Sequence, residues 1–138
     1  MIKLSATSLS KLAGVDPRLV RVVNTAASLA KPEEDFSVLE GLRTLARQRR
    51  LYAQGRTRPG PVVTWTLNSK HIEGKAVDLL PYPEGWGAST ARFNALAALM
   101  FKAAAQEKVS LRWGADWDRD GKPRERGETD SPHFEIAD

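Results

Sequence analysis

Both histidines of this chain lie in short stretches of turn-forming and acidic residues that are far apart in the sequence. The first stretch is residues 69–78 (Ser-Lys-His-Ile-Glu-Gly-Lys-Ala-Val-Asp), and the second is residues 130–135 (Asp-Ser-Pro-His-Phe-Glu). The odd step of seven from His71 to Asp78 would put these side chains on opposite faces of one unbroken strand. Gly74 is the natural site of a turn between them, because glycine tolerates a positive φ. Beyond that turn we expect one strand face to hold Ala76, Asp78 and Leu80, and the other Val77 and Leu79.

The residue types in these stretches favour a metal site. Zinc prefers imidazole nitrogen and carboxylate oxygen, and hydrolytic zinc sites commonly use three protein ligands and keep the fourth position for water. With two histidines in the chain, a histidine pair must be His71 with His133, and Asp78 brings the count to three. The absence of cysteine excludes a thiolate zinc site and a disulfide framework. We therefore predict Zn²⁺ at His71, Asp78 and His133.

The order and spacing of these residues resemble the sequence motif of a known family. The pattern Ser-x-His-x-x-Gly-x-Ala-x-Asp, followed far downstream by Asp-x-x-His-Phe, is similar to the zinc peptidases that cut peptidoglycan stem peptides. That family includes D-Ala-D-Ala carboxypeptidases and dipeptidases and the L-alanyl-D-glutamate endopeptidases of phage lysis. Its single-domain phage branch is further matched by residues 36–43, 54–57 and 113–117, and the resemblance covers residues 8–136.

The resemblance implies roles for residues outside the metal triad. Asp130 lies three residues before His133, where the family has its catalytic carboxylate, so Asp130 is the expected general base, with Glu128 as the second candidate. Arg43 matches the family's arginine at the end of its first strand, which implies a catalytic and substrate-binding role at the scissile carbonyl or the oxyanion. Ser69 matches the leading serine of the motif and is expected to bind substrate. The alternatives are a surface salt bridge for Arg43 and a plain turn residue for Ser69.

The resemblance also implies a function. We expect a zinc-dependent peptidoglycan peptidase that cleaves the stem peptide between L-alanine and D-glutamate, as phage endolysins do. A D-Ala-D-Ala carboxypeptidase with the same metal centre stays open as an alternative, as does a non-catalytic, zinc-containing cell-wall-binding domain. The expected partner is the stem peptide of peptidoglycan.

Length and hydropathy suggest how the chain is organised. At 138 residues we expect one zinc peptidase catalytic domain over residues 1–138, a monomer without a separate cell-wall-binding module. No apolar run reaches the length of a bilayer span, so membrane insertion is not expected. Residues 1–5 lack the apolar centre of a signal peptide. We therefore expect synthesis in the host cytoplasm and action on the cell wall after release.

The formal charge of +4 and the pI near 9.6 favour an anionic partner. Nucleic acid, anionic lipid and anionic cell wall all fit this description. Six arginines fall between Arg43 and Arg58, but no aromatic residues alternate with them as in a stacking surface for bases. We therefore favour a solvated helix face over a specific nucleic-acid site.

A second metal site is a weaker hypothesis. Asp116, Asp118, Asp120 and Gly121 reproduce the opening of a calcium-binding loop. The twelfth position of such a loop needs a bidentate glutamate, and here it is Gly127. A simple turn is therefore the favoured interpretation, with Ca²⁺ at the three aspartates as the alternative.

The hydrophobic periodicity predicts an α+β fold, with a small antiparallel sheet flanked by helices and the zinc site on the sheet. Helices are expected over residues 8–13, 17–30, 45–54 and 90–108, with N-caps at Asp16, Thr44 and Ser89 or Thr90. Strands are expected over residues 36–42, 62–67, 76–80, 111–114 and 134–136. We expect Leu42 and Phe101 to point into the core, and Tyr82 and Trp86 to line a cleft or cover the edge of the core.

Overall fold

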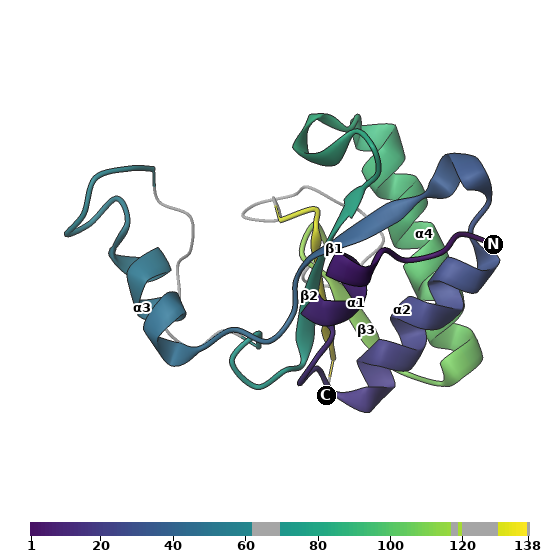
Figure 1. The fold of residues 1–138 in the computed structure, drawn as a ribbon, viewed down its shortest axis with the longest axis horizontal. Coiled ribbons are helices and arrows are strands. Elements are labelled where there is room, and N and C mark those ends of the chain that lie inside the picture. Colours follow the sequence, from purple (N-terminus) through teal and green to yellow (C-terminus); the bar gives the residue numbers. More distant parts are fainter. Residues whose placement is uncertain (62–69, 117–118, 120–129, 138) are drawn as a thin grey trace.

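A four-stranded antiparallel sheet forms the centre of the protein (Figure 1). The computed structural model describes residues 1–61, 70–116, 119 and 130–137. The strands are β1 (Phe36–Glu40), β2 (Ala76–Pro81), β3 (Leu111–Trp113) and β4 (His133–Ile136), in the spatial order β1-β2-β4-β3. The helices are α1 (Ala6–Lys11), α2 (Pro17–Leu29), α3 (Leu45–Ala53) and α4 (Thr90–Glu107), with short 3₁₀ turns at Pro32–Glu34 and Gly85–Gly87. The predicted α+β class is confirmed.

Local sequence signals start α2, α3 and α4 where they were predicted, whereas α1 begins at Ala6, two residues before the predicted start. The Asp16 side chain accepts a hydrogen bond from the backbone of Arg18 at 2.9 Å, and Pro17 takes the first position of α2. Thr44 and Ser89 cap α3 and α4 by accepting from a backbone N–H three positions on. These caps involve residues close together in sequence, which is why they could be predicted from the sequence.

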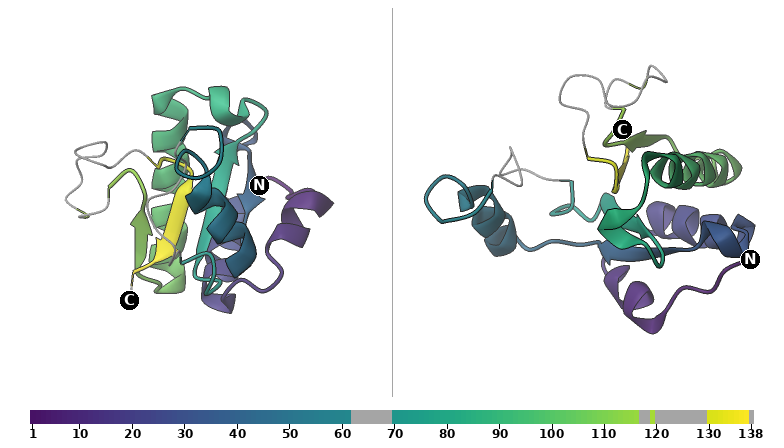
Figure 2. Two further views of the ribbon diagram at one scale, coloured as in Figure 1. Left: turned by 90° about the vertical axis from the view of Figure 1, so that its left-hand side faces the viewer. Right: turned by 90° about the horizontal axis from the view of Figure 1, so that it is seen from above.

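The core lies on one side of the sheet. α2 and α4 pack together and cover that side, whereas α3 lies on the other side of the sheet (Figure 2, right). The core side of the sheet includes Val38, Val77, Leu79, Phe134 and Ile136, all nearly inaccessible to solvent. In β2 the side chains alternate as predicted, so Asp78 faces away from this core.

A β-bulge in β1 changes which side chains face outward. Val38 lies opposite Leu79, and Glu40 lies opposite Asp78. Between these two pairs β1 advances by two residues while β2 advances by one. In a regular strand without the bulge, Glu40 would lie two positions after Val38 on the same face, and its side chain would point into the core. With the bulge, Glu40 joins Asp78 on the outer face.

Two sequence-based expectations about packing were wrong. Leu42 is 49% exposed, because β1 ends at Glu40 and the chain leaves the sheet before Leu42. Phe101 is 38% exposed, because α4 turns Met100 and Ala103 toward α2 and leaves Phe101 beside that stripe. Tyr82 and Trp86 are 56% and 68% exposed, so they are not buried against the edge of the core, and their alternative role of lining a cleft stays a prediction.

The strand predicted over residues 62–67 lies outside the described residues. Among the helices of the described part, none combines the length and apolar character needed to cross a bilayer.

Candidate metal centre

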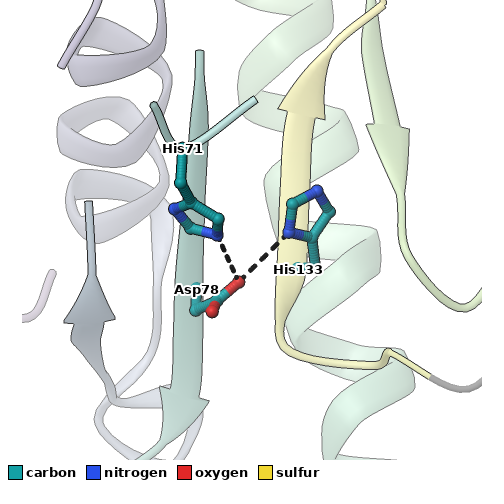
Figure 3. Close-up of side chains that lie close together, drawn as sticks. All are labelled: His71, Asp78 and His133. Atoms are coloured by element: carbon teal, nitrogen blue, oxygen red, sulfur yellow. Dashed lines mark hydrogen bonds and ion pairs between the residues drawn. The ribbon is translucent and has the colours of Figure 1, made fainter. Parts of the chain in front are cut away.

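Two strands and one turn bring the three predicted ligands together on the outer face of the sheet (Figure 3). Asp78 in β2 and His133 in β4 are directly opposite each other in the antiparallel pair. His71 lies in the turn before β2, which closes through a hydrogen bond from the Gly74 backbone N–H to the His71 carbonyl at 3.2 Å. Gly74 has a φ of +71°, and a Cβ there would lie 2.6 Å from the carbonyl oxygen of Gly14. The predicted glycine turn is confirmed.

The ligand atoms converge on the carboxylate of Asp78. His71 Nε2 lies 3.1 Å and His133 Nδ1 lies 3.2 Å from Asp78 Oδ1. The three ligand atoms lie within 4.8 Å of one another. Both imidazoles are buried, and their ring centroids are 5.1 Å apart. In the part of the chain that the structure describes, no other cluster of three such side chains is suited to a metal ion.

Each imidazole is oriented by its other nitrogen. His71 Nδ1 donates to the carbonyl oxygen of Gly41 at 2.7 Å, which leaves Nε2 as the acceptor nitrogen toward Asp78. His133 Nε2 donates to Glu135 Oε1 at 2.8 Å, which leaves Nδ1 toward Asp78. Hydrogen bonds of this kind fix the tautomer of a metal-ligating histidine. A carboxylate and two lone pairs therefore converge on one point, which requires a cation or a proton between them.

The pKa values of Asp78 and His133 reflect this need for a positive charge between the ligand atoms. Burial disfavours the charged form of Asp78, but the neighbouring imidazoles of His133 and His71 outweigh it and hold the pKa of Asp78 well below the usual range. Burial also lowers the pKa of His133, yet its hydrogen bonds to Asp78 and Glu135 raise the pKa to about 9. Without an ion, His133 therefore carries the positive charge that the cluster requires.

Asp130 lies at the edge of the cluster. Its Oδ2 is 3.9 Å from His133 Nδ1, and its side chain is 54% exposed. Gly114 allows this approach, because a Cβ there would collide with the carbonyl oxygen of Asp130. Partial burial, followed by the negative charge of Asp78, raises the pKa of the Asp130 carboxyl. Asp130 is thus a partly solvated carboxylate beside the three ligands and separate from them.

Arg43 reaches the cluster from the other side. Its Nη2 lies 3.9 Å from Asp78 Oδ2, and its side chain is 9% exposed, so the ion pair that Arg43 forms with Glu40 is buried and does not lie on the surface. Glu40 accepts from Arg43 Nε at 2.9 Å and from Nη2 at 2.8 Å. Gln48, fully buried in α3, accepts from Nη1 at 2.6 Å. These three bonds fix the plane of the guanidinium beside Asp78.

Sequence reasoning assigned no role to three residues that hold this site. Glu135 lies two positions after His133 in a strand, so the two side chains share a face, and this spacing could have indicated their contact. Glu40 gave no such signal, because only the bulge turns it outward. Gln48 gave no signal either, because its contact with Arg43 depends on how α3 leaves the sheet.

Several predicted residues are not tested by these contacts. Ser69, Glu128, Asp118 and Asp120 lie outside the described residues. Asp116 is described, and its backbone N–H donates to the carbonyl oxygen of Trp113 at 3.0 Å, which is a turn contact. The calcium hypothesis therefore stays a prediction.

The donor set defines the class of site. Structural zinc sites are closed by four protein ligands, whereas catalytic sites use three and leave one position open. Two imidazoles and one carboxylate, with a free carboxylate and an arginine at the edge, have the composition of a catalytic metal site in a hydrolase.

Comparison with known proteins agrees with this class. The chain belongs to the family of phage L-alanyl-D-glutamate peptidases, whose family model matches residues 1–137. It is 32% identical to the L-alanyl-D-glutamate peptidase of Escherichia phage T5 over 141 residues, 98% of each chain. Its structure is similar to the crystal structure of the L-Ala D-Glu endopeptidase ChiX of Serratia marcescens, with a TM-score of 0.74 and 32% identity. That match covers 98% of this chain and 90% of ChiX.

Proposed function

We propose that this protein is a zinc-dependent endopeptidase that hydrolyses the bond between L-alanine and D-glutamate in peptidoglycan stem peptides. The observation that carries the proposal is the convergence of His71 Nε2, Asp78 Oδ1 and His133 Nδ1, with the other nitrogen of each imidazole already bound. This nitrogen and oxygen donor set suits zinc. The family to which the chain belongs supports the choice of bond.

Asp130 is the general base in this mechanism. Zinc, when bound, acidifies water and polarises the scissile carbonyl. The Asp130 carboxylate lies close enough to the ligand cluster to take a proton from the attacking water and to return it to the leaving amine. Its raised pKa favours this exchange, because a more basic carboxylate holds the proton more readily. Its half-exposed side chain also leaves room for substrate beside it.

Arg43 binds the substrate carbonyl. Three of its five N–H groups are held by Glu40 and Gln48, which leaves one on Nη1 and one on Nη2, and Nη2 lies 3.9 Å from Asp78 Oδ2 at the cluster. A fixed guanidinium beside the cluster stabilises the negative charge that develops on the carbonyl oxygen during attack. We assign Ser69 to substrate binding on its motif position alone.

Digestion of purified sacculi tests the proposal. The wild-type protein, loaded with zinc, should generate new N-terminal D-glutamate, which mass spectrometry of the released muropeptides identifies. Release of terminal D-alanine alone would make the protein a carboxypeptidase. Sacculi that bind the protein and stay intact would make it a non-catalytic cell-wall-binding domain.

A further inference from the structure

The positive charge of the chain is concentrated in one segment. Residues 45–61, which comprise α3 and the turn after it, contain five arginines and no aspartate or glutamate, a net charge of +5. The remaining residues hold 16 basic and 17 acidic side chains, a net charge of −1. We call residues 45–61 the arginine arm. Its five arginines are Arg47, Arg49, Arg50, Arg56 and Arg58.

The arginine arm lies apart from the other helices. In Figures 1 and 2 it extends from the side of the sheet opposite α2 and α4. All five arginines are exposed. Arg47 is paired with Glu40 at 2.9 Å, and Arg56 stacks on the Tyr52 ring at 3.9 Å from its centroid. Within the described part of the chain, no ion pair is formed by Arg49, Arg50 or Arg58.

The arginine arm is connected directly to the metal centre. It begins two residues after Arg43, and Glu40 Oε1 accepts from both Arg43 Nε and Arg47 Nε, each at 2.9 Å. The same carboxylate therefore joins the guanidinium beside Asp78 to the first arginine of the arm. A long anionic ligand bound along the arm would continue into the site.

We propose that the arginine arm binds the carboxylates of peptidoglycan stem peptides that neighbour the one being cut. The inference rests on the proposed function, since it takes the substrate of that site as the ligand of the arm. Guanidinium groups match carboxylates in geometry and charge. Peptidoglycan repeats its carboxylates along the polymer, so several exposed arginines engage it at once. Nucleic acid fits less well, because Arg56 covers the ring of Tyr52, which is the one aromatic residue of the arm.

Sedimentation with purified sacculi tests the arm directly. The arm variant carries Arg49→Gln, Arg50→Gln and Arg58→Gln, changes that remove charge and keep good helix formers at the two positions in α3. Its matched control removes three charges from exposed lysines of the rest of the molecule, with Lys3→Gln, Lys31→Gln and Lys102→Gln. Both are made in an Asp130→Asn background, so that the sacculi stay intact during the measurement.

We expect the arm variant to bind sacculi about tenfold more weakly than its parent, and the control to stay within about twofold. Equal weakening in both variants would overturn the proposal, because net charge alone would then explain binding. Unchanged binding by the arm variant would overturn it as well.

A change in the ligand gives a second test that does not depend on how the variants fold. The unsubstituted protein in the same background should lose the arm's tenfold contribution on sacculi whose carboxylates have been converted to neutral amides. Full binding to amidated sacculi would contradict the proposal. Duplex DNA can be added at a concentration of negative charges equal to that of the sacculi. If it displaces the protein from native sacculi, the arm is a nucleic-acid site instead.

Binding and cleavage separate the two proposals. Suppose that the protein does not cut the bond between L-alanine and D-glutamate but that the arm variant loses binding to sacculi. This result would refute the proposed function and support the proposal for the arm. Cleavage at that bond with arm-independent binding would refute only the arm.

Discussion

Glu135 determines which nitrogen of His133 faces Asp78 and the candidate metal site. The Glu135 carboxylate is 3% exposed and accepts from His133 Nε2, which keeps Nδ1 directed at Asp78. Loss of such an outer partner typically weakens metal binding by about 10- to 100-fold. We predict this loss for Glu135→Ala, with a smaller loss for Glu135→Gln, which keeps an acceptor oxygen. Competition with a chromophoric chelator measures the zinc Kd, and wild-type affinity in Glu135→Ala would contradict the prediction.

Asp130 and His133 are close in sequence but differ in role. Asp130→Asn keeps the size of the side chain and removes the proton acceptor, so zinc should stay bound while kcat falls by about 10² to 10⁴. His133→Ala should lose both zinc and activity. Metal analysis beside kinetics distinguishes the two. Zinc loss in Asp130→Asn would make Asp130 a ligand or a structural support and Glu128 the next base to test.

The charge on His133 predicts how pH acts on the metal-free protein. Its folded pKa of about 9 lies above the ordinary value of 6.5. Protonation therefore stabilises the metal-free fold fully below pH 6.5, and this contribution is lost as pH rises through 9. Zinc must displace that proton, so its binding should strengthen as pH rises from 6.5 toward 9. Melting curves with and without zinc should show the gap in Tm widening over this range, and a constant gap would argue against the assignment.

At the scale of elements, Gly74 determines where His71 lies. Alanine at this position must adopt a φ of +71° with its Cβ 2.6 Å from a backbone oxygen of Gly14. We predict that Gly74→Ala lowers the free energy of unfolding by about 2 kcal/mol and weakens zinc binding, because the turn carries a ligand. Gly87→Ala is the matched control, since a Cβ there has no neighbour within 4 Å. Thermal denaturation and zinc titration of both variants provide the comparison, and equal effects would rule out this explanation.

Features that depend on residues close together in the sequence were predicted, and features that depend on pairing or packing between elements were not. The cap at Asp16, the turn at Gly74 and the face of Asp78 follow from residues a few positions apart. The outward turn of Glu40 does not, because the bulge at Leu39 exists only in the pairing of β1 with β2. The exposure of Phe101 likewise depends on where α2 lies against α4. The ligands of the site were therefore predictable, and the residues that hold Arg43 were not.

At the scale of the whole molecule, the core and the metal centre are on opposite sides of the sheet. α2 and α4 bury one face without using any of the three ligands. We therefore predict that chelation removes about one zinc per chain and abolishes activity without complete unfolding. Metal analysis, activity and far-UV circular dichroism before and after chelation test this, with zinc restored as the control. Helical signal that disappears with the metal would contradict it.

The pairing of Asp78 with His133 has a consequence for folding itself. β2 and β4 meet through Ala76 with Glu135, Val77 with Phe134, and Asp78 with His133. A slip of one residue would bury the imidazole among apolar side chains and bring Phe134 to the outer face. A cation held by ligands from both strands binds only one of these alignments, and it lowers the free energy of that alignment alone. The ion that serves the chemistry would thus also select the correct strand alignment while the chain is still finding its fold.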